Sequence, residues 1–234
     1  MPPMPEFYRV ETHCHTIFSE DSLTQPADLL AACRKKGIDR VIITDHNTLS
    51  GARTAQKLDP ARVIVGEEIM TRAGELLAAF VVEEIPAGLT AHEAIRRLRD
   101  QGAFISISHP FDVTRSGHWK LPDLLEIAPL VDAIEIFNAR CFSAKMDAQA
   151  QAFARHHHLS GTVGSDAHTV YELGTATLEM PLFHDAETFR QSLGHARQQV
   201  RRSPAWVRLA SRYAVIVKKL RIAKYELVCW SIAP

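Results

Sequence analysis

Residues 39–46 read Asp-Arg-Val-Ile-Ile-Thr-Asp-His, a β-branched apolar run that ends in an acid and a histidine. Residues 103–110 (Ala-Phe-Ile-Ser-Ile-Ser-His-Pro) repeat the design, as do residues 160–168, which end in Gly-Ser-Asp-Ala-His. Helix-like segments such as residues 26–37 and 90–102 separate the strand-like runs. Alternation of this kind predicts an α/β protein, and strands that are apolar almost throughout indicate a parallel sheet covered on both faces.

Polar residues gather where the strand-like runs stop. Nearly every run ends in His, Asp or Glu just as its apolar character ceases. In a closed β/α barrel the carboxyl ends of the strands converge on one mouth, so residues far apart in sequence meet there. The pattern therefore favours a barrel over an open sheet and predicts one functional site at its mouth.

The composition is that of an ordinary globular protein. The chain has 234 residues, of which 46% are apolar and 23% charged. Its four cysteines, Cys14, Cys33, Cys141 and Cys229, lie far apart without CxxC spacing, which indicates neither a disulfide framework nor a zinc ribbon. There is no signal-peptide pattern and no apolar run of roughly 18 residues, so we predict a cytoplasmic protein without a transmembrane segment.

The last part of the chain differs in charge from the rest. Residues 197–234 contain nine Lys/Arg and one acid, whereas residues 1–196 contain 18 Lys/Arg and 26 acids. From Pro204 to Trp230, apolar residues recur every three or four positions with basic residues between them, which predicts a basic amphipathic helix. We expect a barrel over residues 1–196 and a helical extension over 197–234 that packs on it, with an anionic membrane or nucleic acid as the alternative contact.

His13 and His15 form an HxH motif within a predicted strand. Side chains alternate along a strand, so both imidazoles point to one face and Cys14 to the other. Two nitrogen donors on one face are suited to gripping a metal ion. Alone the motif is weak, because strand histidines are more often surface or packing residues.

Five further segments make a metal site the better interpretation of the HxH motif. Each is short and rich in His, Asp or Glu: Ser19–Ser22, Thr44–His46, Gly66–Ile69, Ser108–Pro110 and Gly164–His168. A single carboxylate at a strand end often caps the following helix, but five such ends in register are poorly explained by capping.

With these motifs the chain resembles the polymerase and histidinol phosphatase (PHP) family of metal-dependent phosphoesterases. The HxH, SxD, TDH, GxE, HP and GSDAH motifs occur in family order, and the resemblance covers roughly residues 7–180. It implies a distorted TIM-like (β/α)7 barrel with the amphipathic helix at its C-terminal end. It also implies two or three divalent metal ions, either Mn, Zn or Fe.

The resemblance further implies a ligand set. His13 and His15 would bind the first ion together with Asp166, and Glu68 would bridge that ion to a second one held by His109. Asp21, His46 and His168 would hold a third ion. Two of the carboxylates have a neighbour as alternative: Glu67 in place of Glu68, and Glu20 in place of Asp21.

One position departs from the family pattern. Some relatives carry a histidine ligand of the second ion where this chain offers Glu75. A glutamate supplies an oxygen ligand instead of a nitrogen ligand. Compared with a purely histidine-rich site, which suits zinc, this exchange favours Mn or Fe. Glu135 is expected to stand behind the ligands and orient an imidazole.

Two ions about 3.5 to 4 Å apart lower the pKa of a shared water and hold phosphoryl oxygens, so we predict a metal-bound hydroxide as nucleophile. Arg115 and Arg140 follow strand ends and are candidate phosphate-binding guanidinium groups.

The predicted activity is hydrolysis of a phosphate ester. The substrate would be a phosphorylated small molecule, a nucleotide or an oligonucleotide end, with histidinol phosphate and nuclease activity as narrower alternatives. A scaffold that binds metal and nucleic acid without turnover is the alternative from another class, and C–N bond hydrolysis on a similar barrel ranks last. The sequence leaves the oligomeric state open.

Overall fold

The computed structural model describes residues 7–230 and is built on one nine-stranded sheet in the order β7-β6-β5-β4-β3-β2-β1-β8-β9. The strands are β1 (Phe7–Glu11), β2 (Arg40–Ile43), β3 (Val63–Met70), β4 (Glu75–Ala79), β5 (Phe104–Ile107), β6 (Ala133–Asn138), β7 (Ser160–Gly164), β8 (Ala176–Pro181) and β9 (Arg197–Val200). The helices are α1 (Pro26–Lys35), α2 (Ser50–Leu58), α3 (Ala91–Asp100), α4 (Leu121–Ile127), the short 3-10 helix η1 (Ala128–Leu130), α5 (Ala144–His156), α6 (Ala186–Leu193) and α7 (Val207–Trp230).

Strands β1 to β7 curl into a nearly closed barrel. Beyond the regular part of β1, Cys14 pairs in parallel with Ala167, which follows β7. The His15 amide donates to the Ala167 carbonyl at 2.8 Å, and the Ala167 amide donates to the His13 carbonyl at 3.3 Å. The predicted distorted barrel is therefore confirmed, and the segments that follow β1 and β7 pair with each other at its mouth. Strand β8 pairs antiparallel with β1, and β9 pairs antiparallel with β8.

Strand β4 runs against its neighbours. It pairs antiparallel with both β3 and β5, whereas β2–β3, β5–β6 and β6–β7 are parallel. A tight turn, in which the Thr71 amide donates to the Gly74 carbonyl at 3.0 Å, joins β3 to β4 without a helix. Because β4 is reversed, its first residue, Glu75, lies at the mouth where the other strands end. A regular succession of β/α units does not predict this reversal.

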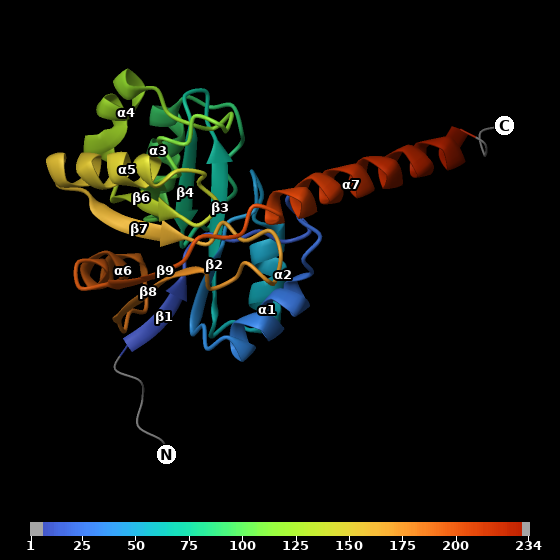
Figure 1. Ribbon diagram of the computed structural model, residues 1–234, viewed down its shortest axis with the longest axis horizontal. Helices are drawn as coiled ribbons and strands as arrows, with labels where there is room; N and C mark the ends of the chain where they lie inside the picture. Colours follow the sequence, from blue (N-terminus) through green and yellow to red (C-terminus); the bar gives the residue numbers. More distant parts are fainter. Residues whose placement is uncertain (1–6, 231–234) are drawn as a thin grey trace, which may run out of the picture.

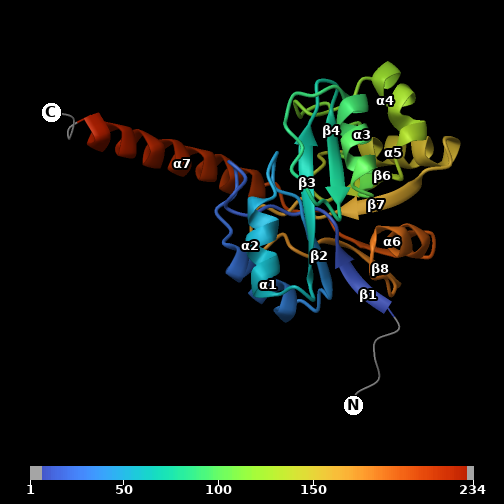
Figure 2. The same cartoon turned by 180° about the vertical axis from the view of Figure 1, so that it is seen from behind.

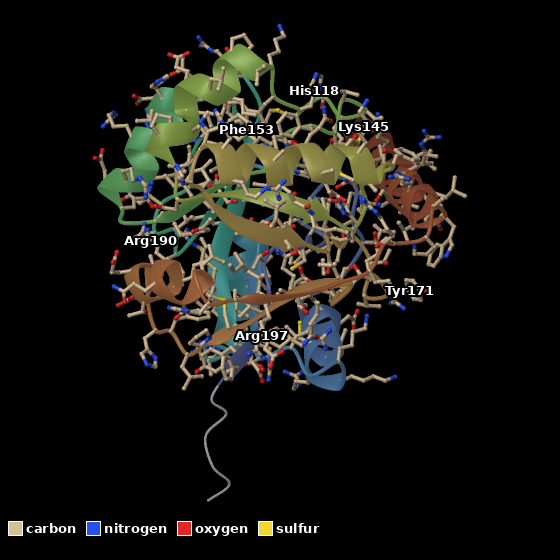
Figure 3. The ribbon with its side chains drawn as sticks, turned by 60° about the vertical axis from the view of Figure 1, so that its left-hand side comes forward. His118, Lys145, Phe153, Tyr171, Arg190 and Arg197 are labelled. Atoms are coloured by element: carbon tan, nitrogen blue, oxygen red, sulfur yellow. The ribbon has the colours of Figure 1, made fainter. Side chains whose placement is uncertain are left out.

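Apolar side chains fill both sides of the sheet. One cluster lies between the strands and the surrounding helices, and a second fills the barrel interior. Figures 1 and 2 show α1 and α2 beside β1 and β2, with α3, α4 and α5 around the other side of the barrel. Phe189 of α6 is fully buried in the interior cluster, and its ring centroid lies 4.8 Å from that of Phe104, the first residue of β5. Figure 3 shows Phe153 on α5 and Arg190 on α6, two helices that flank β7.

The apolar residues of helix α7, the C-terminal helix that the periodicity predicts, differ in their exposure. Val207 and Ala214 are buried, but Leu209, Ile216 and Leu220 are exposed. Figures 1 and 2 show the helix leaving the barrel and extending away from it. Over residues 207–220, the part of the helix whose side chains are described, one face of α7 contacts the barrel and the other is exposed. Within the described part of the chain, no helix has the length and apolar character needed to span a membrane.

Candidate metal centre

Nine predicted ligands lie at the mouth of the barrel. His13 and His15 follow β1, His46 follows β2, and Glu68 lies in β3. Glu75 begins β4, His109 follows β5, and Asp166 and His168 follow β7. Asp21 comes from the loop between β1 and α1. Residues up to 155 positions apart in sequence are thus brought together by the convergence of the strand ends.

Glu68 lies at the centre of this cluster. Its Oε2 atom is 3.2 Å from His13 Nε2, 3.3 Å from His15 Nε2 and 3.1 Å from His46 Nδ1. Its Oε1 atom is 3.2 Å from His109 Nε2. One carboxylate therefore reaches four imidazoles.

Glu67 points away from the cluster, as alternation along a strand requires. Its Oε2 atom accepts a hydrogen bond of 3.0 Å from the Ile85 amide. Burial, with a smaller contribution from Glu84, raises the pKa of Glu67 to about 8. Of the two neighbouring glutamates, the structure brings only Glu68 to the mouth.

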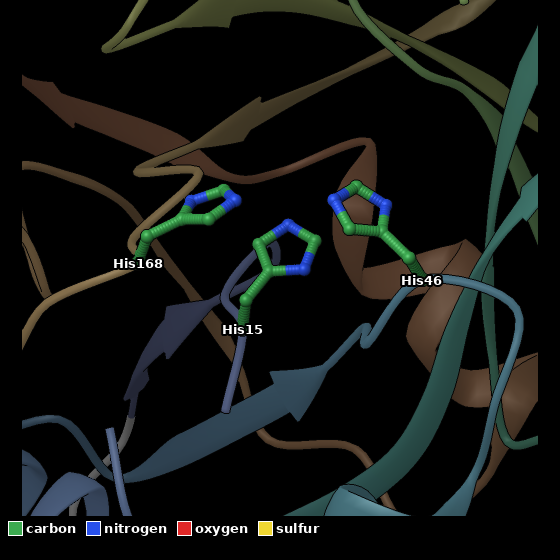
Figure 4. Close-up of side chains that lie close together, drawn as sticks. All are labelled: His15, His46 and His168. Atoms are coloured by element: carbon green, nitrogen blue, oxygen red, sulfur yellow. The ribbon is translucent and has the colours of Figure 1, made fainter. Parts of the chain in front are cut away.

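Three imidazoles form the outer part of the cluster (Figure 4). The ring centroid of His15 is 4.4 Å from that of His46 and 4.1 Å from that of His168. Asp21 lies between the outer two rings, 3.6 Å from His46 Nε2 and 2.8 Å from His168 Nε2. The neighbouring Glu20 is exposed at the edge of the mouth and makes neither contact.

A layer of hydrogen bonds behind the imidazoles fixes their orientation. Glu135 Oε1 lies 2.9 Å from His13 Nδ1, and Glu135 Oε2 accepts from the His109 amide at 2.9 Å. Ser19 Oγ lies 3.0 Å from His15 Nδ1 and donates to Asp45 at 2.7 Å. The role expected for Glu135 therefore has a direct geometric basis, since a ring nitrogen held from behind leaves the other directed at the mouth.

The backbone at the end of β7 makes room for this layer. At Gly164 an added Cβ would lie 2.1 Å from Glu135 Oε1 and 2.6 Å from His13 Cβ. Asp166 has φ +51°, a left-handed conformation that Asp adopts more readily than most residues. These constraints explain why Gly and Asp occur at these positions of the GSDAH segment.

The donor set fits divalent cations. Three groups of residues each bring their ligand atoms within 4.8 Å of one another: His13, His15 and Glu68; His46, Glu68 and Glu75; and His15, His46 and His168. Among the described residues, the buried atoms His15 Nε2 and Asp166 Oδ1 have no hydrogen-bond partner, although they lie 3.5 Å apart. Unpaired buried polar atoms are costly unless a ligand satisfies them.

The pKa shifts favour the ligating forms of two of these residues. Burial, followed by the nearby His168 and His46, holds the pKa of His15 well below its usual value, so its imidazole stays neutral. Burial opposes ionisation of Asp166, but Arg115 and His13 outweigh it and hold the pKa of this carboxyl well below its usual range. A neutral imidazole and an ionised carboxylate are the forms that bind metal.

The two candidate arginines lie in different environments. Arg115 borders the mouth cavity of about 540 Å³ that Asp21, His46 and Glu75 also line, and its Nη2 lies 2.5 Å from Asp166 Oδ2. Arg140 is only 6% exposed, with Nε 2.9 Å from Glu172 and Nη1 2.9 Å from His168 Nδ1. Its Nη2 donates to Ser211 Oγ of α7 at 2.7 Å. Both guanidinium groups are thus paired within the protein, but Arg115, which also contacts Asp112 at 3.1 Å, lines the mouth cavity, whereas Arg140 does not.

Two buried glutamates at the mouth were missed by the sequence reasoning. Glu11 accepts hydrogen bonds from the amides of His13, Ser165 and Gly174 at 2.9 to 3.3 Å, and burial raises its pKa to about 7. Its spacing of two and four residues from the HxH histidines does not place it with them, because β1 ends at Glu11 and regular alternation stops there. Glu172 accepts from the His168 amide at 3.1 Å, and no local pattern marks it.

A reversed-strand barrel with a histidine and carboxylate cluster at its mouth defines a metal-binding α/β-barrel protein. The family description PHP domain matches residues 11–107, and the description PHP-associated matches residues 148–197. An uncharacterized protein of Methanocaldococcus jannaschii is 38% identical over 174 residues, which cover 73% of this chain and 70% of that protein. The chain belongs to the PHP family.

Two solved structures share the fold. A Bifidobacterium adolescentis protein, provisionally assigned as a metal-dependent phosphoesterase, matches with a TM-score of 0.61 at 18% identity, over 79% of this chain and 95% of that one. The lesion-specific endonuclease EndoQ of Pyrococcus furiosus matches with a TM-score of 0.54 at 15% identity, over 83% of this chain and 57% of that one. Family membership and the cluster together support a metal-dependent hydrolase.

Proposed function

We propose that this protein hydrolyses phosphate esters with divalent metal ions bound at the barrel mouth. The observation that carries the proposal is the position of Glu68, whose two carboxylate oxygens reach four imidazoles from three different segments. A carboxylate that bridges such donors is suited to joining two ions.

The proposed ligands divide into three sets, of which the first two share Glu68. His13, His15, Glu68 and Asp166 would hold one ion. Glu68, Glu75 and His109 would hold the second, with Glu75 Oε2 3.5 Å from His109 Nε2. Asp21, His46 and His168 would hold the third. The oxygen donor at Glu75 is consistent with Mn or Fe as well as Zn.

When bound, such ions supply Lewis-acid activation of a water nucleophile and of the phosphoryl oxygens. The protein's own residues position the reactants. Arg115, at the mouth cavity, would bind a phosphoryl oxygen through its guanidinium. Glu135 holds His13 from behind, and Arg140 acts as a positioning residue that ties His168 to α7.

The proposed substrate is a phosphorylated small molecule, a nucleotide or an oligonucleotide end. The shared fold with a lesion-specific endonuclease keeps nuclease activity as a second candidate. The mouth cavity of about 540 Å³ accommodates a phosphate with a small leaving group, and its lining includes Phe18 and Met70 beside the polar ligands.

The test is an activity panel on protein loaded separately with Mn, Zn or Fe. Para-nitrophenyl phosphate, its bis ester, a nucleoside monophosphate and a 5′-phosphorylated oligonucleotide would be assayed. We expect hydrolysis of at least one ester, abolished in His13→Ala and retained in His156→Ala, an exposed histidine at the end of α5. Metal-loaded protein that is inactive on every ester but binds DNA tightly would instead establish a scaffold.

The same panel tests Arg115. A hydrogen bond to a charged group contributes about 1.5 to 3 kcal/mol, so Arg115→Gln should raise KM for the best ester by roughly 10- to 100-fold. Retention of metal, measured by elemental analysis, would show that the effect lies in phosphate binding. An unchanged KM would remove Arg115 from the substrate site.

A further inference from the structure

Helix α7 carries an apolar stripe that the rest of the described chain does not cover. The stripe consists of five side chains that are 49% to 65% exposed: Trp206, which directly precedes the helix, and Leu209, Tyr213, Ile216 and Leu220 within it. Their spacings of three and four residues place them on one helix face. Contiguous apolar surface of this kind on a soluble protein marks an interaction site.

The opposite face of α7 holds the helix on the barrel. Val207 and Ala214 are buried there, and Ser211 Oγ accepts from Arg140. Lys218 Nζ donates to the carbonyls of Ile17, at 2.6 Å, and Ser19, so it binds the loop that carries Asp21. At 100° per residue these four positions point about 120° to 180° from Ile216 and Leu220. The helix cannot roll its stripe onto the barrel without breaking these contacts.

The stripe continues onto the neighbouring loop. The Tyr171 ring centroid lies 5.1 Å from that of Trp206, and Figure 3 shows Tyr171 at the edge of the molecule. Val170 is 40% exposed and lines, with Tyr213, a cavity of about 540 Å³ between this loop, α1 and α7. Aromatic and branched side chains thus form one surface that extends from the barrel along the helix.

The positive charge beside the stripe distinguishes between its possible binding partners. Arg212 and Lys219 are exposed and flank the stripe, and residues 197–234 contain nine Lys/Arg against one acid. Pairing with α7 of a second copy would bring these like charges together, which is unfavourable. The surface of an anionic lipid bilayer matches both the apolar stripe and the positive charge beside it. Basic residues next to an apolar face with Trp and Tyr are typical of helices that lie in a lipid interface.

We propose that the stripe of α7 docks on an anionic lipid bilayer, with the helix lying in the plane of the interface. Arg212 and Lys219 would bind headgroups while Ile216 and Leu220 enter the acyl boundary. The contacts of Arg140 and Lys218 join this helix to the mouth of the barrel, so docking would hold the metal centre close to the membrane surface.

The experiment is co-sedimentation of the full chain with vesicles of phosphatidylcholine alone or mixed with phosphatidylglycerol. We expect binding to the anionic vesicles and little to the neutral ones. Ile216→Glu with Leu220→Glu should weaken vesicle binding by at least about ten-fold. Arg212→Gln and Lys219→Gln should each weaken it roughly five-fold. Val82→Glu, a control at a 63% exposed position away from α7, should bind like the unchanged chain.

Three outcomes would overturn the proposal. One is that the unchanged chain binds neutral vesicles as well as anionic ones, and that Ile216→Glu with Leu220→Glu leaves this binding unchanged. Another is a dimer, detected by light scattering without lipid, that Ile216→Glu with Leu220→Glu converts to monomer while no vesicle binding is found. The third is nucleic-acid binding that depends on Arg212 and Lys219 in the absence of vesicle binding. Circular dichroism of each variant would show that the fold is retained.

Discussion

The inner and outer ends of the histidine and carboxylate cluster at the barrel mouth differ in how firmly the protein holds them. At the inner end, the side chains of His13, Glu68, His109 and Asp166 are fully buried, and Glu135 binds two of these residues from behind. At the outer end, the side chains of His46 and Asp21 are 25% and 24% exposed. The outer residues belong to the cavity wall, where solvent enters.

The difference has a physical consequence for metal binding. Buried, hydrogen-bonded ligands are preorganised, so removing one leaves unsatisfied buried groups that water cannot easily replace. A partly exposed ligand on a loop can be replaced by water at lower cost. We therefore expect the inner end to be essential for activity and the outer end to adjust it.

The largest expected effect comes from Glu68→Gln. It removes a charge shared by four imidazoles, so kcat/KM should fall by more than about 100-fold, and bound metal should fall with it. Elemental analysis and the best ester of the panel measure the two effects. Glu67→Gln is the matched control, because this neighbour faces the opposite side and its raised pKa, about 8, keeps it protonated at neutral pH. Equal losses in both variants would contradict the central position of Glu68.

The second effect comes from Glu135→Gln, which weakens the support behind the inner end. Residues of this kind typically contribute 10- to 100-fold to metal affinity. Chelator competition should show a loss of that size, because His13 Nδ1 loses its carboxylate partner at 2.9 Å. Glu126→Gln, an exposed change on α4, is the control. An unchanged metal affinity would show that the packing around His13 suffices to orient it.

Much of the inner end could be predicted from the sequence, because local alternation and strand ends determine where its side chains point. The apolar run before Ser108 and His109 and the HxH spacing that includes His13 are local signals of this type. The reversal of β4 is not local, since it depends on the tight Thr71–Gly74 turn and on pairing with two neighbours. Glu75 was therefore identified as a departure from the family pattern, and its place at the mouth became clear only with the fold.

Helix α7 shows a different limit. Its periodicity predicts an apolar face but does not say what covers that face, since a helix buried on a barrel and one docked on a membrane share the same spacing. Arg140 illustrates the same point for a single side chain. Its position after a strand end suggested a phosphate ligand, whereas its pairing with Glu172 and Ser211 depends on segments that are distant in sequence.

A third, smaller effect is expected at the outer end from Asp21→Asn. Its partly exposed carboxylate contacts His46 and His168, and water can substitute for it, so activity should fall by about ten-fold, less than for Glu68→Gln. Steady-state kinetics across a manganese titration measure the loss, which excess metal should partly restore. Glu20→Gln serves as the matched control. A loss as large as that of Glu68→Gln, without rescue by metal, would place Asp21 with the inner ligands.

The smallest expected effect concerns the pH dependence of the protein's folding stability, through a buried carboxylate that supports the inner end of the cluster. Asp147 of α5 accepts a 3.4 Å hydrogen bond from the Asn138 amide, and the Asn138 side chain donates to Glu135 and Asp166. Burial, only partly offset by Arg202, raises the pKa of Asp147 to about 6. The folded state therefore holds this proton more tightly than the unfolded chain, so the Asp147 contribution to stability falls as pH rises from about 4 to about 6.

Asp147→Asn should remove that dependence. Relative to the unchanged protein, its free energy of unfolding should improve by about 1 to 3 kcal/mol between pH 4 and pH 7, a range that allows for solvent screening. Urea unfolding in the presence of a chelator at both pH values measures this, since bound metal would otherwise add its own pH dependence. Asp123→Asn, in the first turn of α4, is the control. Parallel pH profiles for Asp147→Asn and the unchanged chain would mean that Arg202 keeps the carboxylate ionised throughout, and that the support of the inner end is insensitive to pH.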